Sequence, residues 1–120
     1  MKRKSTEALL TEYRATAALH GHAQHHGPTR TCNRAYDKLT RIRLELQTRG
    51  DDHRRRVLAF LDDEDPAVRS WAAVDALALS PDDGLRVLRE VAAGPPSMVR
   101  LDAEMILKQW EAGEWDTSIP

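Results

Sequence analysis

Residues 61–73 read Leu-Asp-Asp-Glu-Asp-Pro-Ala-Val-Arg-Ser-Trp-Ala-Ala, and this stretch contains an explicit helix start. Asp65 can accept a hydrogen bond from a backbone amide of the first turn, and Pro66 suits the first helical position because its φ is already helical. Val68 then begins an apolar stripe that continues at helical spacing through Ala72. The stretch therefore predicts a turn followed by an amphipathic helix.

Together with similar sites of Gly, Pro and Asp elsewhere, this turn divides the whole chain into six segments of helical character. The chain has 16 Ala and 14 Leu against 6 Val and 3 Ile, a composition that favours helix over strand. We predict an all-α fold with about six helices in three antiparallel hairpins, within a single domain of residues 1–120 whose ends, 1–4 and 114–120, are loose. The expected helices cover about 5–24, 31–49 and 52–61, then begin at Pro66 and at Pro81, and finish with about 96–112.

An internal repeat becomes visible when the chain is shifted by 31 residues, because the third and fourth segments then fall on the fifth and sixth. Val68 falls on Val99, and Arg69 falls on Arg100. A repeated unit of two helices is typical of an α-solenoid, in which each hairpin buries its face against the next. The repeat predicts a short solenoid.

Residues 65–73 match the D-P-x-V-R-x-x-A-A pattern and so resemble the core of a HEAT repeat. In that family the Asp and the Arg tie the turn together, while the small residues let adjacent helices pack closely. The second copy retains Val99 and Arg100 but has no Asp-Pro pair. The resemblance implies a HEAT-like solenoid.

Further residues carry a second resemblance: Asn33 with Tyr36, Glu45-Leu46 leading to Gly50, and residues 110–113. Through them most of residues 5–115 resembles a small bacterial family recorded only as a domain of unknown function. This resemblance implies a compact HEAT-like helical domain and no particular activity. Similar small helical folds serve as immunity proteins beside bacterial toxins, which makes such a role an expectation for this chain.

The charges are strongly divided along the chain. Residues 1–60 hold 13 basic and 6 acidic side chains, a net charge of +7, whereas residues 61–120 hold 5 and 13, a net charge of -8. Two halves of opposite charge can attract different partners. The single Cys32 permits no intrachain disulfide, and no apolar run approaches the ~20 residues of a transmembrane helix. We expect a soluble cytoplasmic protein with no membrane partner.

Catalytic signatures are missing from the sequence. It contains no Gly-rich phosphate loop, no nucleophile elbow and no His paired with a plausible nucleophile, so we expect no enzyme activity and no cofactor. His22 and His26 lie at i and i+4 and are a weak candidate pair of metal ligands. Because two ligands do not complete a zinc site, we expect no metal and interpret the histidines as a polar helix end.

The second helix of each hairpin lines the groove of a solenoid, which suits protein binding. Asp75 occupies the stripe position that Ile106 takes in the other repeat, so it either pairs with a nearby Arg or contributes to a binding site. We predict a non-catalytic protein-interaction domain, of the immunity or antitoxin type, that binds and neutralises a basic toxin. The candidate partner-binding residues are Arg69, Trp71, Asp75, Asp102 and Glu104.

Two alternatives remain open. The Arg-rich N-terminal half, with Arg54, Arg55 and Arg56 at its end, could bind nucleic acid as a HEAT-like domain. Against this, the whole chain is slightly acidic and no aromatic residues interleave with the arginines to stack on bases. The other alternative is a homodimeric structural protein that packs through Trp71 or Trp115.

Overall fold

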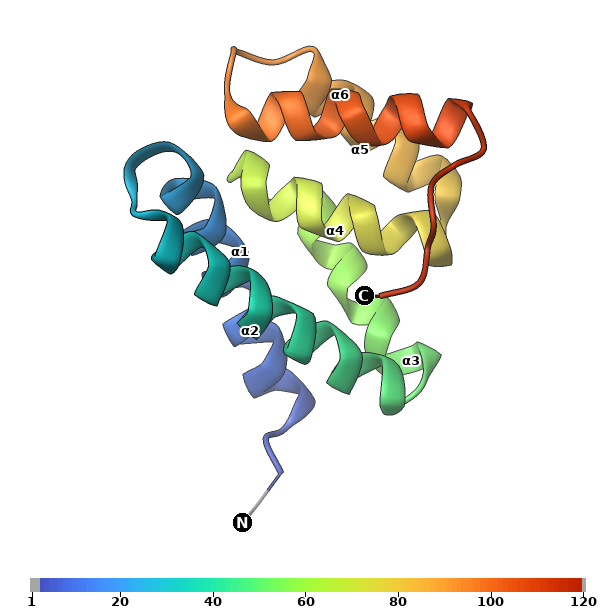
Figure 1. Ribbon diagram of the computed structural model, residues 1–120. Coiled ribbons are helices and arrows are strands. Elements are labelled where there is room, and N and C mark those ends of the chain that lie inside the picture. The colour runs from blue at the N-terminus through green and yellow to red at the C-terminus, as the bar shows by residue number, and fades with distance from the viewer. Residues whose placement is uncertain (1–2, 120) are drawn as a thin grey trace. The chain divides into compact units, whose positions relative to one another are not determined.

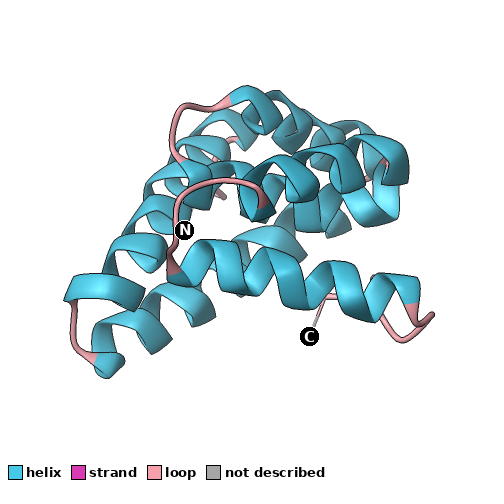
Figure 2. Ribbon diagram, turned by 90° about the horizontal axis from the view of Figure 1, so that it is seen from above, coloured by secondary structure: helices cyan, strands magenta, loops and turns pink. Residues whose placement is uncertain are grey.

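The computed structural model describes residues 3–119, and within them the chain is helical with no strand (Figure 2). The all-α prediction is therefore confirmed. The ends of the predicted loose tails, residues 1, 2 and 120, lie outside the described residues. None of the described helices is long and apolar enough to cross a membrane. The helices are α1 (Thr6–His26), α2 (Thr29–Thr48), α3 (Asp51–Arg54), the 3-10 helix η1 (Arg55–Asp62), α4 (Pro66–Leu79), α5 (Pro81–Ala92) and α6 (Met98–Glu111). Figure 1 labels the α-helices.

The chain forms two compact units. Unit 1 consists of Met1–Val57 with Ile119–Pro120, and unit 2 consists of Leu58–Ser118. The boundary between them lies inside η1 and coincides with the change of charge along the sequence. Unit 1 contains 13 basic and 6 acidic residues, and unit 2 contains 5 and 13. Unit 1 therefore has a net positive charge and unit 2 a net negative charge.

Unit 1 is built on the packing of α1 against α2. Tyr13 and Ala17 of α1 are fully buried, as are Leu39 and Leu46 of α2. The buried positions of α2 follow the alternating three- and four-residue spacing of one helix face, which explains why this segment is helical. Cys32, at the start of the same stripe, is only half-buried.

The segment between the units differs from the expected regular helix over 52–61. It forms one turn of α-helix, α3, and then continues as the 3-10 helix η1, so the expected position is right and the helix type is wrong. Arg54 and Val57 are buried, and Phe60 packs against the core of unit 2. These residues recur every third position, which matches the three residues per turn of a 3-10 helix.

Unit 2 has a core formed by small and branched side chains of α4, α5 and α6. The α5 helix packs against both α4 and α6, and α4 also contacts α6. Gly84 permits a close approach of α5 to α4, because a Cβ at this position would lie 2.8 Å from the carbonyl oxygen of Ala73. Trp115, in the segment after α6, packs against this core. The segment predicted as a loose tail is therefore anchored at Trp115.

Candidate functional site

Arg69 lies in the first turns of α4 and holds the preceding turn. Its Nη1 donates to the carbonyl oxygens of Asp63, at 2.8 Å, and Glu64, at 3.2 Å. The Asp65 carboxylate accepts from the amide of Ala67 at 2.9 Å and so caps the helix, as its sequence predicts. This candidate partner-binding arginine thus has its guanidinium engaged by backbone carbonyls.

Arg100 makes the equivalent contact in the second copy of the repeat. Its Nη1 donates to the carbonyl oxygen of Gly94 at 3.1 Å, again six residues back along the chain. The missing Asp-Pro pair is replaced by Ser97, whose hydroxyl accepts from the amide of Arg100 at 3.0 Å. The donors and the acceptors of the two contacts are both 31 residues apart, which is the repeat length read from the sequence.

Of the five candidate residues on α4 and α6, Asp75 is buried and the other four are half-buried. Asp75 is 1% exposed, so its carboxylate lies inside the fold and not on the rim of a groove. Trp71 is half-buried. Asp102 and Glu104 of α6 are half-buried as well, and the Glu104 carboxylate accepts from the Nε of Arg100 at 2.9 Å. Asp75 is therefore the one of these candidates that a partner could not reach.

An apolar stripe that the sequence analysis missed runs along the same helix. Met98, Leu101 and Met105 are 42%, 56% and 51% exposed, and their spacing of three and four places them on one face of α6. The opposite face carries the buried Val99 and Ala103. Asp102, next to Leu101 in sequence, lies beside this stripe. We call Met98, Leu101 and Met105 the α6 stripe. These residues are spaced at helical intervals on the side of α6 opposite its core positions, and this spacing is the signal in the sequence that could have revealed them.

The three arginines proposed for nucleic acid do not form one exposed patch. Arg54 is 7% exposed. Arg55 and Arg56 are exposed, but Nη1 of Arg56 lies 2.8 Å from the carboxylate of Glu7. This contact holds the pKa of Glu7 below its usual value, chiefly through the hydrogen bond with Arg56. Only Arg55 and part of Arg56 face solvent.

A different set of basic residues in unit 1 is exposed together. Arg30, Arg34, Lys38 and Arg41 of α2 all face solvent, and their helical spacing places them along one side of the helix. Lys38 also lies 3.7 Å from the carboxylate of Glu12 on α1. We call these four residues the α2 basic face.

The histidines at the end of α1 come together as their spacing predicts. The ring centroids of His22 and His26 lie 5.2 Å apart, and those of His25 and His26 lie 5.7 Å apart. Among residues 3–119, no three His, Cys, Asp or Glu side chains are grouped so as to hold a metal ion. The pair therefore offers two ligands, which by themselves do not complete a protein metal site.

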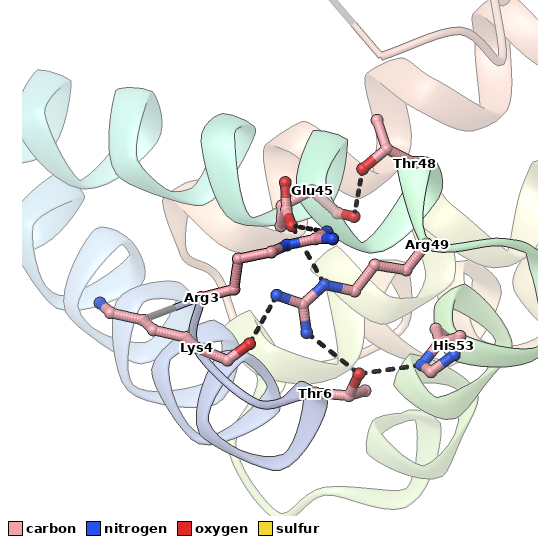
Figure 3. Close-up of polar contacts among 7 residues, drawn as sticks. All are labelled: Arg3, Lys4, Thr6, Glu45, Thr48, Arg49 and His53. Atoms are coloured by element: carbon pink, nitrogen blue, oxygen red, sulfur yellow. Dashed lines mark hydrogen bonds and ion pairs between the residues drawn. The ribbon is translucent and has the colours of Figure 1, made fainter. Parts of the chain in front are cut away.

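The most connected polar cluster lies where α1 begins and α2 ends. Arg49 donates from Nε to the Glu45 carboxylate at 3.1 Å, from Nη1 to the Thr6 hydroxyl at 3.2 Å and from Nη2 to the Lys4 carbonyl (Figure 3). Arg3 contacts the same carboxylate at 2.6 Å. Hydrogen bonds from Arg3 and then Arg49 hold the pKa of Glu45 below its usual value.

Residues 7–111 match the model of a family described as a domain of unknown function (DUF2019), and the chain belongs to that family. The expectation that most of the chain falls in a family of unknown function is thereby confirmed. No curated protein and no solved structure matches the chain.

Proposed function

We propose that this protein is a non-catalytic, cytoplasmic protein-interaction domain of the immunity or antitoxin type, which binds a basic toxin and neutralises it. The observation that carries the proposal is the α6 stripe with Asp102 beside it. The partner is a protein with an apolar patch bordered by basic residues, because those are the groups that complement this surface.

The apolar part of the surface supplies the driving force for association. Three large apolar side chains, each close to half exposed or more, lie in line over two turns of α6. Water leaves these side chains when a partner covers them, and each square ångström of apolar surface removed from water contributes roughly 25 cal/mol. Methionine side chains are flexible and polarizable, so Met98 and Met105 can adapt to the shape of the partner.

The net negative charge of unit 2 determines which class of partner it attracts. With 13 acidic and 5 basic residues, the unit attracts positively charged proteins and repels negatively charged ones. Toxins that cleave nucleic acid need a positive surface for their own substrate. An acidic domain is therefore suited to cover such a surface.

We further propose that η1 and α4, followed by α5 and α6, are two HEAT-like repeats. The repeated arginine contacts of Arg69 and Arg100 support this proposal, as does the contact of α4 with α6. In a solenoid the second helix of each hairpin lines the binding surface, and α6 is the second helix of its repeat.

The proposal is tested by affinity capture from the native host after nuclease treatment, with the chain of residues 1–120 as bait. Leu101→Ser removes the centre of the α6 stripe, and Leu19→Ser removes a leucine of unit 1 that is 46% exposed. A basic protein retained in equal amount by the wild type and by Leu19→Ser, but lost with Leu101→Ser, supports the proposal. Equal retention by both variants contradicts it.

A second candidate function is nucleic-acid binding, which the α2 basic face favours. Four exposed cationic side chains along one side of a helix can neutralise successive phosphates. In this case the affinity for an oligonucleotide falls steeply as the salt concentration rises. Replacing Arg34 and Arg41 by Gln would lower both the affinity and the dependence on salt.

A further inference from the structure

The cluster around Arg49 borders a surface pocket of about 510 Å³ within unit 1. Its volume is in the range of small-ligand sites, which hold about 300–1,000 Å³. Among the described residues that line it there are basic side chains and hydroxyl groups but no carboxylate. The lining residues are Arg3, Lys4, Thr6, Thr48, Arg49 and His53.

Arg49 is fixed in place before any ligand arrives. Its side chain is 12% exposed, and three of its N–H groups donate to Glu45, Thr6 and Lys4 (Figure 3). A guanidinium has five N–H donors, so two remain beyond these three bonds. A guanidinium held rigidly at a pocket wall loses little conformational entropy when it binds an oxyanion.

Arg3 and Lys4 add two mobile cations at the same opening. The side chains of Arg3 and Lys4 are 71% and 59% exposed, and each contacts a glutamate, Glu45 at 2.6 Å and Glu12 at 2.7 Å. Exposed ion pairs of this kind contribute only about 0–1 kcal/mol. A phosphate dianion can therefore compete for either cation.

The Thr6 hydroxyl links Arg49 to His53. Thr6 Oγ1 lies 2.8 Å from His53 Nδ1 and also accepts from Arg49 Nη1. An imidazole that accepts at Nδ1 carries its proton on Nε2, which leaves Nε2–H as a further donor. The pocket thus combines a fixed guanidinium, two mobile cations and an imidazole.

We propose that this pocket binds the phosphate group of a small phosphorylated molecule. Arg49 provides the fixed donors, Arg3 and Lys4 move from their glutamates to the phosphate oxygens, and His53 donates from Nε2. Charge-assisted contacts of this type are the strongest hydrogen bonds that side chains make to oxyanions. The site belongs to unit 1 and is independent of the α6 stripe.

The test is an NMR titration of the ¹⁵N-labelled full chain with sodium phosphate, and with sodium chloride at the same ionic strength. We expect phosphate, but not chloride, to shift the backbone amides of residues 4–8 and 48–53. Arg3→Ala and Lys4→Ala are exposed substitutions that each weaken phosphate binding by about tenfold. Arg86→Ala removes an exposed arginine of α5 that belongs to none of the proposed binding surfaces, and it leaves the affinity unchanged. Arg49→Lys keeps the positive charge but removes the planar guanidinium, and it also weakens phosphate binding.

A second arm compares a nucleoside monophosphate with the unphosphorylated nucleoside. Only the monophosphate is expected to reproduce the shifts of the pocket amides. The proposal is overturned if chloride gives the same shifts, if neither Arg3→Ala nor Lys4→Ala weakens binding, or if the monophosphate does not bind. Shifts centred on residues 30–41 would also overturn it, in favour of nucleic-acid recognition by the α2 basic face.

Discussion

Arg69 and Arg100, which lie 31 residues apart, make the same hydrogen bond near the start of α4 and of α6. Nη1 of Arg69 donates to the carbonyl oxygen of Asp63, and Nη1 of Arg100 donates to that of Gly94. Each arginine bridges from the first turns of its helix to the turn that precedes the helix. Carbonyls in tight turns lack partners within a helix, so a guanidinium that reaches them stabilises the turn.

We expect Arg69→Ala to lower the free energy of unfolding by about 1–2 kcal/mol, because two carbonyl oxygens lose a charged donor. Arg100→Ala should have a similar effect. The measurement is urea unfolding followed by circular dichroism. Arg86→Ala is the matched control, since Arg86 makes only exposed contacts within α5, to Asp83 and Glu90, and its loss should change stability by less than about 0.5 kcal/mol. Equal effects of Arg69→Ala and Arg86→Ala would show that the turn contact does not stabilise unit 2.

The helix caps of unit 2 predict a graded series of losses in the free energy of unfolding. Asp65→Ala and Ser97→Ala each remove a side chain that accepts from a backbone amide. Each substitution should lower the free energy of unfolding by about 1 kcal/mol. Ser80 precedes α5, but its hydroxyl donates to the Asp83 carboxylate at 2.7 Å and does not cap a backbone amide. Ser80→Ala should therefore have the smallest effect of the three in the same unfolding assay. A larger loss for Ser80→Ala than for Ser97→Ala would contradict this ranking.

Gly84 predicts a packing penalty between α5 and α4. A Cβ there would meet the Ala73 carbonyl oxygen at 2.8 Å and the Leu77 amide nitrogen at 3.1 Å, and both are backbone atoms that cannot turn aside. We expect Gly84→Ala to destabilise the protein by about 1–3 kcal/mol, although alanine is the better helix former. Ala78→Ser, at an exposed position of α4, is the control and should leave the unfolding midpoint nearly unchanged. A stabilised Gly84→Ala variant would mean that helix propensity outweighs the close contact.

The Glu45 carboxylate predicts a loss of stability in acid. Its pKa is lowered in the folded protein by hydrogen bonds from Arg3 and Arg49, so the unfolded state binds a proton more readily. The resulting stabilisation is complete above the unfolded-state pKa, about 4.3, and is lost as the pH falls through the lower folded-state value. Glu45→Gln removes the titrating group, so urea midpoints measured across this range should fall less steeply than those of the wild type. A Glu45→Gln profile parallel to that of the wild type would contradict the assignment.

Much of the fold could be predicted from the sequence because its signals are local. Asp65 and Pro66 mark the start of α4, and the spacing of Ala35, Leu39, Ile42 and Leu46 marks the buried face of α2. The 3-10 conformation of η1 was missed because periods of 3.0 and 3.6 residues are difficult to distinguish over eight residues.

The candidate sites were harder to predict because they depend on contacts between distant segments. Arg49 and Thr6 are 43 residues apart, and only the packing of α1 on α2 brings them together. For Asp75 the sequence left open a pair with a nearby Arg or a binding site, and its burial depends on the tertiary fold. The spacing of the α6 stripe is present in the sequence, but it identifies exposed apolar residues only after the buried face of the helix is known.

Amide hydrogen exchange of the captured complex tests most directly whether the α6 stripe is the binding surface. The exchange rates of the free chain and of the chain bound to its protein partner are compared peptide by peptide. We predict that binding slows exchange over residues 98–108 and leaves α2 unchanged. Protection confined to α1 and α2, with residues 98–108 exchanging as in the free chain, would contradict the proposed function.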